Sequence, residues 1–153
     1  MWVLPLLGDR KPLPLPKAGS SETDGAFSPD GRWLAYASNE SGKQEVYVRA
    51  FPATEVGGKW QISVGSGMVP RWRKDGRELF YRTEDNKMMA VEVSTGAAFR
   101  HGVPRQLFES SNGTTRDYAV TADGKRFLIP VGVPVADPGR LTVIINWNQG
   151  LKP

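Results

Sequence analysis

Residues 27–36 read Phe-Ser-Pro-Asp-Gly-Arg-Trp-Leu-Ala-Tyr, and the Asp-Gly-Arg at their centre recurs further along the chain. The other copies are Asp75-Gly76-Arg77 and Asp123-Gly124-Lys125, which follow at spacings of 45 and 48 residues. An apolar residue stands three positions before each Asp, and an apolar run follows each basic residue. A repeat with a nearly fixed period of this size predicts an array of similar units rather than one irregular domain.

Each Asp-Gly pair is predicted to form the tight turn of a β-hairpin. Glycine accepts the positive φ that such a turn requires, and the Asp side chain can bond to nearby backbone. Single Asp residues in these loops also lack the ligand spacing of a calcium-binding loop. The predicted role of these residues is therefore structural, and they are Asp30, Gly31, Asp75, Gly76, Asp123 and Gly124.

Further strand-like runs follow each hairpin, so that a complete unit has four strands. A third strand is expected in all three units, at residues 46–48, 89–93 and 141–145. A fourth strand is expected in the first two units, at residues 60–63 and 105–108. Four antiparallel strands in about 40–45 residues match one blade of a WD40-type propeller. The expected fold class is all-β, a partial β-propeller of four-stranded antiparallel WD40-like blades with about 13 strands.

The whole chain, 1–153, is interpreted as one propeller segment. Residues 1–17 resemble the third and fourth strands of a preceding blade, and their two prolines fit an outer strand because proline cannot donate to a ladder. Residues 18–66 and 67–112 form two complete blades, and 113–153 form a final blade without its outer strand. Strands that are apolar on successive residues indicate sheets covered on both faces, as stacked blades are.

The amino-acid composition excludes several kinds of functional site. The chain of 153 residues has no Cys, which excludes disulfides, thiolate catalysis and Cys–metal sites. Its first residues do not form a signal peptide, and no run approaches the about 20 apolar residues of a membrane helix. The formal net charge of +4 is mild and spread along the chain, which disfavours nucleic-acid binding.

No constellation of residues for catalysis is found. His101 is the only histidine, and a lone histidine in a predicted loop cannot form a His-based metal site. Gly65-Ser66-Gly67 lacks the spacing of a hydrolase nucleophile elbow. The sequence therefore predicts no catalytic residue, no metal site and no cofactor.

The most basic cluster surrounds Trp72. Strand alternation points Trp72 away from Arg71 and Arg73 and into the blade core, where Phe27 is its counterpart. Arg71 and Arg73 are the candidate contacts with an anionic ligand or an acidic partner at the channel mouth. Other aromatic residues recur at equivalent strand positions and are expected to pack between blades, namely Trp2, Trp33, Tyr36, Tyr47, Trp60, Tyr81 and Trp147.

Residues 27–36 resemble the signature of the WD40-like repeats in TolB-type β-propellers. The stretches 45–51, 58–63 and 70–81 are similar to the C-terminal propeller that many bacterial serine/threonine protein kinases carry beyond their catalytic domain. The third unit departs from the pattern, because Thr121-Ala122 replaces the Ser-Pro before its Asp-Gly. The resemblance implies an extracytoplasmic, for example periplasmic, location, and the sequence also allows the cytoplasm.

The function expected from this resemblance is a non-catalytic binding or sensing module that recognises a protein or small ligand through propeller loops and channel. The alternative is an accessory propeller of an enzyme, either a signalling kinase or a prolyl-oligopeptidase-type peptidase, whose catalytic domain is absent from this chain. Propellers have typically 4–8 blades, so the expected partners also include the remaining blades of a larger propeller, or further copies that close a ring.

Overall fold

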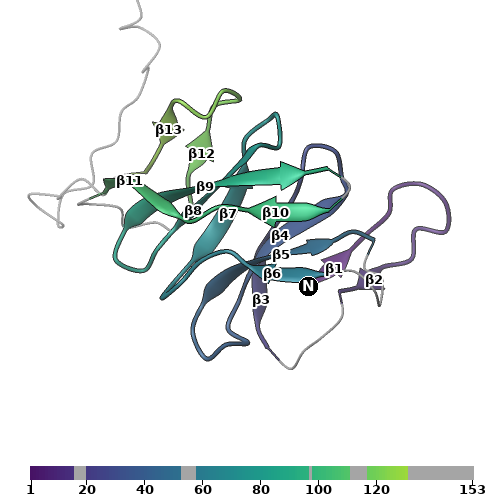
Figure 1. Ribbon diagram of the computed structural model, residues 1–153. Coiled ribbons are helices and arrows are strands. Elements are labelled where there is room, and N and C mark those ends of the chain that lie inside the picture. The colour runs from purple at the N-terminus through teal and green to yellow at the C-terminus, as the bar shows by residue number, and fades with distance from the viewer. Residues whose placement is uncertain (16–19, 53–57, 97, 111–116, 131–153) are drawn as a thin grey trace, which may run out of the picture.

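The computed structural model describes residues 1–15, 20–52, 58–96, 98–110 and 117–130, and every regular element in these ranges is a β-strand. Thirteen strands pair into four antiparallel sheets, which confirms the all-β class (Figure 1). None of these sheets closes on itself within the described ranges. The predicted third strand of the last unit, 141–145, and Trp147 lie outside them.

The first sheet has the order β3-β4-β5-β6. Its strands are β3 (Glu22–Phe27), β4 (Trp33–Ser38), β5 (Glu45–Ala50) and β6 (Lys59–Gln61). All neighbours in this sheet are antiparallel, and the turn that joins β3 to β4 contains the first Asp-Gly pair. This is the four-stranded meander predicted from the sequence for the first complete unit.

The second sheet begins with the order β7-β8-β9 and differs at its outer edge. Its strands are β7 (Met68–Trp72), β8 (Glu78–Arg82), β9 (Lys87–Thr95), β10 (Phe99–His101) and β11 (Arg105–Glu109). The long strand β9 pairs with β11 along its first half and with β10 along its second half. The fourth strand position is thus occupied by two short segments.

The prediction that His101 lies in a loop between the third and fourth strands is therefore wrong. His101 pairs with Val93 as the last residue of β10. The loop is limited to Gly102, Val103 and Pro104, and the Gly102 N–H donates to the Glu92 carbonyl at 2.9 Å. Proline cannot donate to the ladder, so pairing with β9 is interrupted there and resumes at β11.

Two short strand pairs flank the two large sheets. The N-terminal pair consists of β1 (Trp2–Val3) and β2 (Leu13–Pro14), and the C-terminal pair of β12 (Ala119–Val120) and β13 (Phe127–Leu128). Both pairs are antiparallel, and the third Asp-Gly turn joins β12 to β13. The N-terminal strands have two residues each, which is short for the third and fourth blade strands expected within residues 1–17.

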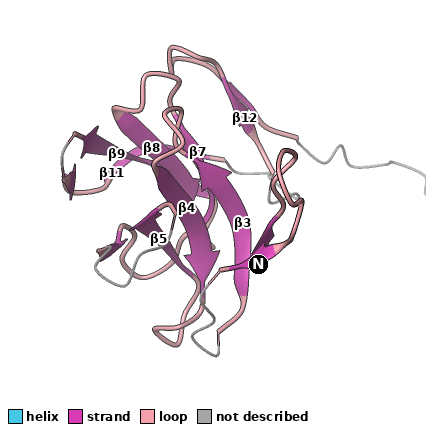
Figure 2. Ribbon diagram, turned by 90° about the vertical axis from the view of Figure 1, so that its right-hand side faces the viewer, coloured by secondary structure: helices cyan, strands magenta, loops and turns pink. Residues whose placement is uncertain are grey.

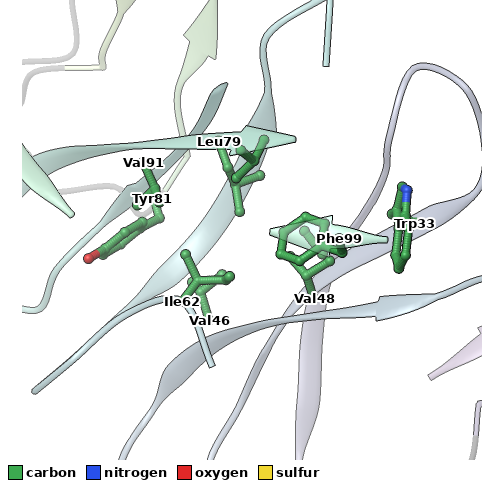
Figure 3. Packing of buried hydrophobic residues seen from close by; sticks show 10 residues of the cluster. Trp33, Val46, Val48, Ile62, Leu79, Tyr81, Val91 and Phe99 are labelled. Atoms are coloured by element: carbon green, nitrogen blue, oxygen red, sulfur yellow. The ribbon is translucent and has the colours of Figure 1, made fainter. Parts of the chain in front are cut away.

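The two large sheets pack face to face. Alternate residues of β4 and β5 point from the first sheet towards alternate residues of β8 and β9, and Figure 2 shows β3, β4 and β7 where the sheets meet. The resulting first hydrophobic cluster is seen in Figure 3, and it contains Trp33, Ala35, Val46, Val48, Ile62, Leu79, Tyr81, Val91, Val93 and Phe99. Burial of this much apolar area is the main stabilising contribution between the sheets.

The outer faces of the large sheets are covered by the short pairs. Leu34 and Tyr36 of the first sheet pack against Val3 and Leu15, and Phe80 of the second sheet packs against Tyr118 and Phe127. The described layers therefore follow the chain in the order N-terminal pair, first sheet, second sheet, C-terminal pair. The apolar runs of β4 and β8, buried at every position, follow from this double cover.

Two aromatic residues expected in the core are exposed instead. Phe27 faces the N-terminal pair and is 46% exposed, because strands of two residues are too short to cover the end of β3. Trp2 is 67% exposed, since its neighbour Val3 is the residue that points into the first sheet. By contrast Tyr36, Tyr47 and Tyr81 are buried as predicted.

Candidate functional site

The three Asp-Gly turns have one backbone geometry. In each, the Asp carboxylate accepts a hydrogen bond from the backbone N–H two residues further on, at 3.0–3.1 Å. The glycine N–H of each turn donates to the carbonyl three residues before it, at 2.8–2.9 Å. The glycine φ values are positive in all three, +70° at Gly31, +71° at Gly76 and +72° at Gly124. These are the conformations that favour glycine.

A second side chain holds the Asp in each turn. Ser28 Oγ donates to Asp30 at 2.6 Å, and Thr121 Oγ1 donates to Asp123 at 2.5 Å. These hydroxyl hydrogen bonds lower the pKa of both carboxyls below the usual range, because they stabilise the ionised form.

The middle turn uses a guanidinium in place of the hydroxyl. Arg73 Nε and Nη2 donate to the two oxygens of Asp75 at 2.7 and 2.8 Å. This charge-assisted pair lowers the pKa of Asp75 from its ordinary 3.8 to about 2 and raises the pKa of Arg73. Arg73 therefore has a structural role, because it stabilises the Asp75-Gly76 turn.

Arg71 and Arg73, the two residues proposed from the sequence as ligand contacts, both lie beside the C-terminal pair. Arg71 Nη2 donates to Asp117 at 3.0 Å, and its guanidinium lies 5.9 Å from the centre of the Tyr118 ring. Arg73 Cδ lies 2.9 Å from the position that a Cβ on Gly124 would take. Both arginines thus join the second sheet to the next layer of the chain.

Trp72 points the other way, as strand alternation predicts. Its ring packs against the first hydrophobic cluster, and its Nε1 donates to the Ala26 carbonyl of β3 at 3.0 Å. The tryptophan is therefore an interface residue between the two large sheets and is not available for stacking on a base.

A cavity of about 770 Å³ opens at the end of the second sheet, beside the Asp75-Gly76 turn. Four arginines and three carboxylates line it, together with the last residues of β9. The charged lining residues are Arg32, Arg73, Arg77, Arg105, Asp75, Glu78 and Glu92. Because they come from the first turn, the second turn, β8, β9 and β11, the cavity exists only in the folded stack.

Glu78 organises one side of this cavity. Its side chain is only 8% exposed, and its two oxygens accept from Arg73 Nη1 at 2.9 Å and Arg105 Nη2 at 2.7 Å. A buried carboxylate needs such partners, since an unpaired buried charge is strongly destabilising. Glu78 thereby orients two guanidinium groups from segments that are remote in sequence.

Arg32 and Arg77 occupy the same position in successive turns and line the same cavity. Arg32 Nη2 donates to the Thr95 carbonyl at 2.6 Å and its Nε donates to Asp30 at 2.9 Å. Arg77 is exposed, and within the described residues its guanidinium has no carboxylate partner. The cavity therefore holds one guanidinium that forms no ion pair with a described residue.

The sequence reasoning found only Arg73 of this arrangement and missed Arg32, Arg77, Arg105 and Glu78. A signal for two of them was present, since a basic residue follows each Asp-Gly at the same position in all three units. The structure does not bring His101 into the lining of the cavity. Among the described residues there is no group of three or more His, Cys, Asp or Glu arranged to hold a metal ion.

No family model matches the chain, and no curated protein matches it. In the part of the chain that the structure describes, no helix is long and apolar enough to cross a membrane.

Proposed function

We propose that this chain is a non-catalytic binding or sensing module, built as a segment of a β-propeller with WD40-like blades. The observation that carries the binding function is the cavity of about 770 Å³, in which ion pairs hold Arg73, Glu78 and Arg105 in place. Its volume lies within the about 300–1,000 Å³ of small-molecule sites. A site of oriented guanidinium and carboxylate groups is suited to binding rather than to nucleophilic chemistry.

The stacking of layers supports the propeller part of the proposal. Equivalent positions of successive sheets face in the same direction along the stack. Trp33 and Ala35 point from the first sheet to the second, and Phe80, which is equivalent to Ala35, points from the second sheet to the C-terminal pair. Repetition of one relation between neighbouring four-stranded units is the construction principle of a propeller.

The outer layers of the stack support further association. Trp2 of the N-terminal pair is 67% exposed and Leu128 of the C-terminal pair is 74% exposed, so each described end presents apolar surface. Exposed apolar patches mark interaction surfaces or aggregation sites. We propose that the remaining blades of a larger propeller cover these ends, with ring closure between identical chains as the second possibility.

Sedimentation velocity on the isolated chain tests the architecture. The chain is expected to associate in a concentration-dependent way, and the double variant Trp2→Ser/Leu128→Ser is expected to associate less. Lys43→Ser, in an exposed turn away from both ends, is the control. A stable monomer that does not associate at any concentration contradicts both forms of the proposal.

The binding function is tested separately by a ligand panel. Thermal unfolding is followed with neutral, cationic and anionic small molecules, and each ligand that raises Tm is recovered and analysed by mass spectrometry. A ligand that stabilises the fold and is recovered unchanged supports a binding module, because only species that bind the native state raise Tm. Conversion of the ligand overturns the non-catalytic proposal, and absence of any stabilising ligand overturns the binding role.

A further inference from the structure

Four arginines and three carboxylates line the cavity beside the Asp75-Gly76 turn, and Asp30, which is outside the lining, pairs with Arg32. Arg73 is fully engaged with Asp75 and Glu78, and Arg105 shares Glu78 through Nη2 alone. Within the described residues, Arg77 has no ion pair, and Nε and Nη1 of Arg105 have no acceptor. The cavity therefore keeps guanidinium N–H donors for a molecule from outside.

Two of the guanidinium groups in the cavity are held in place before any ligand arrives. The guanidinium of Arg105 is fixed on the buried carboxylate of Glu78, and that of Arg32 is fixed between Asp30 and the Thr95 carbonyl. Arg32 and Arg105 nevertheless remain 58% and 59% exposed at the side chain, so a ligand reaches them from solvent. Fixing flexible side chains in advance lowers the entropy lost on binding, which raises affinity.

The arrangement of the arginines determines the kind of ligand. A guanidinium presents paired N–H donors that match the oxygens of a carboxylate or phosphate. Arg32, Arg77 and Arg105 come from the first turn, the second turn and β11, and they reach one volume of about 770 Å³. A molecule with several anionic groups can pair with more of these guanidinium groups at once than a single anionic group can, because each group supplies its own acceptor oxygens.

We propose that this cavity binds a small molecule that carries two or more phosphate or carboxylate groups, through Arg77, Arg105 and the Nη1 group of Arg32. This inference rests on the proposed binding function and names the ligand class of that site. A long nucleic-acid strand fits less well, since the formal net charge of +4 is mild and spread along the chain.

Isothermal titration calorimetry with the whole chain tests the proposal. Tripolyphosphate and citrate are the probes, and they distinguish a phosphate ligand from a carboxylate ligand. Wild-type protein is expected to bind at least one of them. Arg77→Gln is expected to weaken that binding at least about tenfold, because one charge-assisted contact is worth about 1.5–3 kcal/mol and 1.4 kcal/mol is tenfold in affinity.

Lys74→Gln is the matched control. Lys74 precedes the same turn, is exposed and does not line the cavity, so its substitution removes one nearby positive charge without removing a donor. It is expected to change affinity less than about twofold, because exposed charges outside the site act only through screened attraction. Equal urea midpoints for Lys74→Gln and Arg77→Gln show that the fold is unchanged. If the two midpoints differ, Arg105→Gln is tested in place of Arg77→Gln.

Three results overturn the inference. These are absence of binding to both probes, equal weakening by Lys74→Gln and Arg77→Gln, and tighter binding of a single-stranded oligonucleotide than of either probe at the same salt. None of these results contradicts the broader proposal of a binding module, which fails only when the full ligand panel gives no stabilising ligand. The two proposals are thus separable.

Discussion

The turn at Asp30-Gly31 and the turn at Asp75-Gly76 share their backbone hydrogen bonds and differ in the side chains around them. Two residues before the Asp stands Ser28 in one turn and Arg73 in the other. Three residues after the Asp, Trp33 of the first turn corresponds to Glu78 of the second. The same backbone conformation thus presents the hydroxyl of Ser28 and the indole of Trp33 in the first turn, and the ion-paired side chains of Arg73 and Glu78 in the second.

This difference shows which parts of the repeat are structural and which are specialised. In the first turn both side chains serve the fold, because Ser28 bonds within the turn and Trp33 packs between the large sheets. In the second turn Glu78 accepts hydrogen bonds from Arg73 and from Arg105 of β11, and all three residues line the cavity. Backbone geometry is conserved between the units of this chain, and the side chains alone give the second turn its charged site.

Trp33→Ala is expected to have the largest effect on stability. Trp33 is 8% exposed, and its ring lies 5.2 Å from that of Phe99 and 5.6 Å from that of Trp60. Truncation leaves a cavity between the large sheets and is expected to lower the free energy of unfolding by about 3–5 kcal/mol. Urea unfolding followed by far-UV circular dichroism measures the loss, and a loss smaller than that of Glu78→Gln contradicts the assignment of Trp33 to packing.

Glu78→Gln is expected to have an intermediate effect at the equivalent position of the second turn. The substitution keeps the shape of the side chain and removes the charge that holds Arg73 and Arg105, which is expected to cost about 2 kcal/mol. Glu92→Gln is the matched control, because Glu92 lies opposite Glu78 in the register and is exposed without an ion pair in the described residues. Equal losses in the two variants contradict a special role for Glu78.

Ser28→Ala is expected to have a smaller effect, which isolates the hydroxyl of the first turn. Ser28 Oγ donates to Asp30 and accepts from the Trp33 N–H at 3.0 Å, so its loss is expected to cost about 1 kcal/mol. Ser41→Ala, in an exposed turn, is expected to change stability by less than about 0.5 kcal/mol. Urea midpoints of the two variants decide whether the hydroxyl contributes as the geometry indicates.

The repeat pattern contained enough information to predict the hairpins and their turns. Asp-Gly between apolar runs predicts the turn at Gly31, Gly76 and Gly124, and uninterrupted apolar runs predict that β4 and β8 are covered on both faces. The opposite orientations of Trp72 and Arg71 follow from strand alternation. These features depend on local chemistry, which sequence patterns record directly.

The features that escaped prediction depend on contacts between remote segments. Glu78 and Arg105 are 27 residues apart, and their ion pair forms only after the sheet has been assembled. The segment Phe99–His101 is too short to be recognised as a strand, and it becomes β10 only because β9 extends far enough to pair with it. The exposure of Phe27 likewise depends on how little of it the N-terminal pair covers.

The smallest expected effect concerns the acid response of the two turns, in which Ser28 and Arg32 bond Asp30 and Arg73 bonds Asp75. The guanidinium of Arg73 lowers the pKa of Asp75 to about 2, and the hydroxyl of Ser28, with help from Arg32, also lowers the pKa of Asp30. A carboxyl with a depressed folded-state pKa contributes stability that is complete above its ordinary value of 3.8 and is lost as the pH falls through the folded-state pKa. Stability is therefore expected to decline between about pH 4 and pH 2, and Asp75→Asn is expected to flatten that decline more than Asp30→Asn. Carboxyl carbon NMR titration checks the order directly, and titration of Asp75 at or above the pH of Asp30 contradicts a stronger effect of the two Arg73 hydrogen bonds than of Ser28 and Arg32 together.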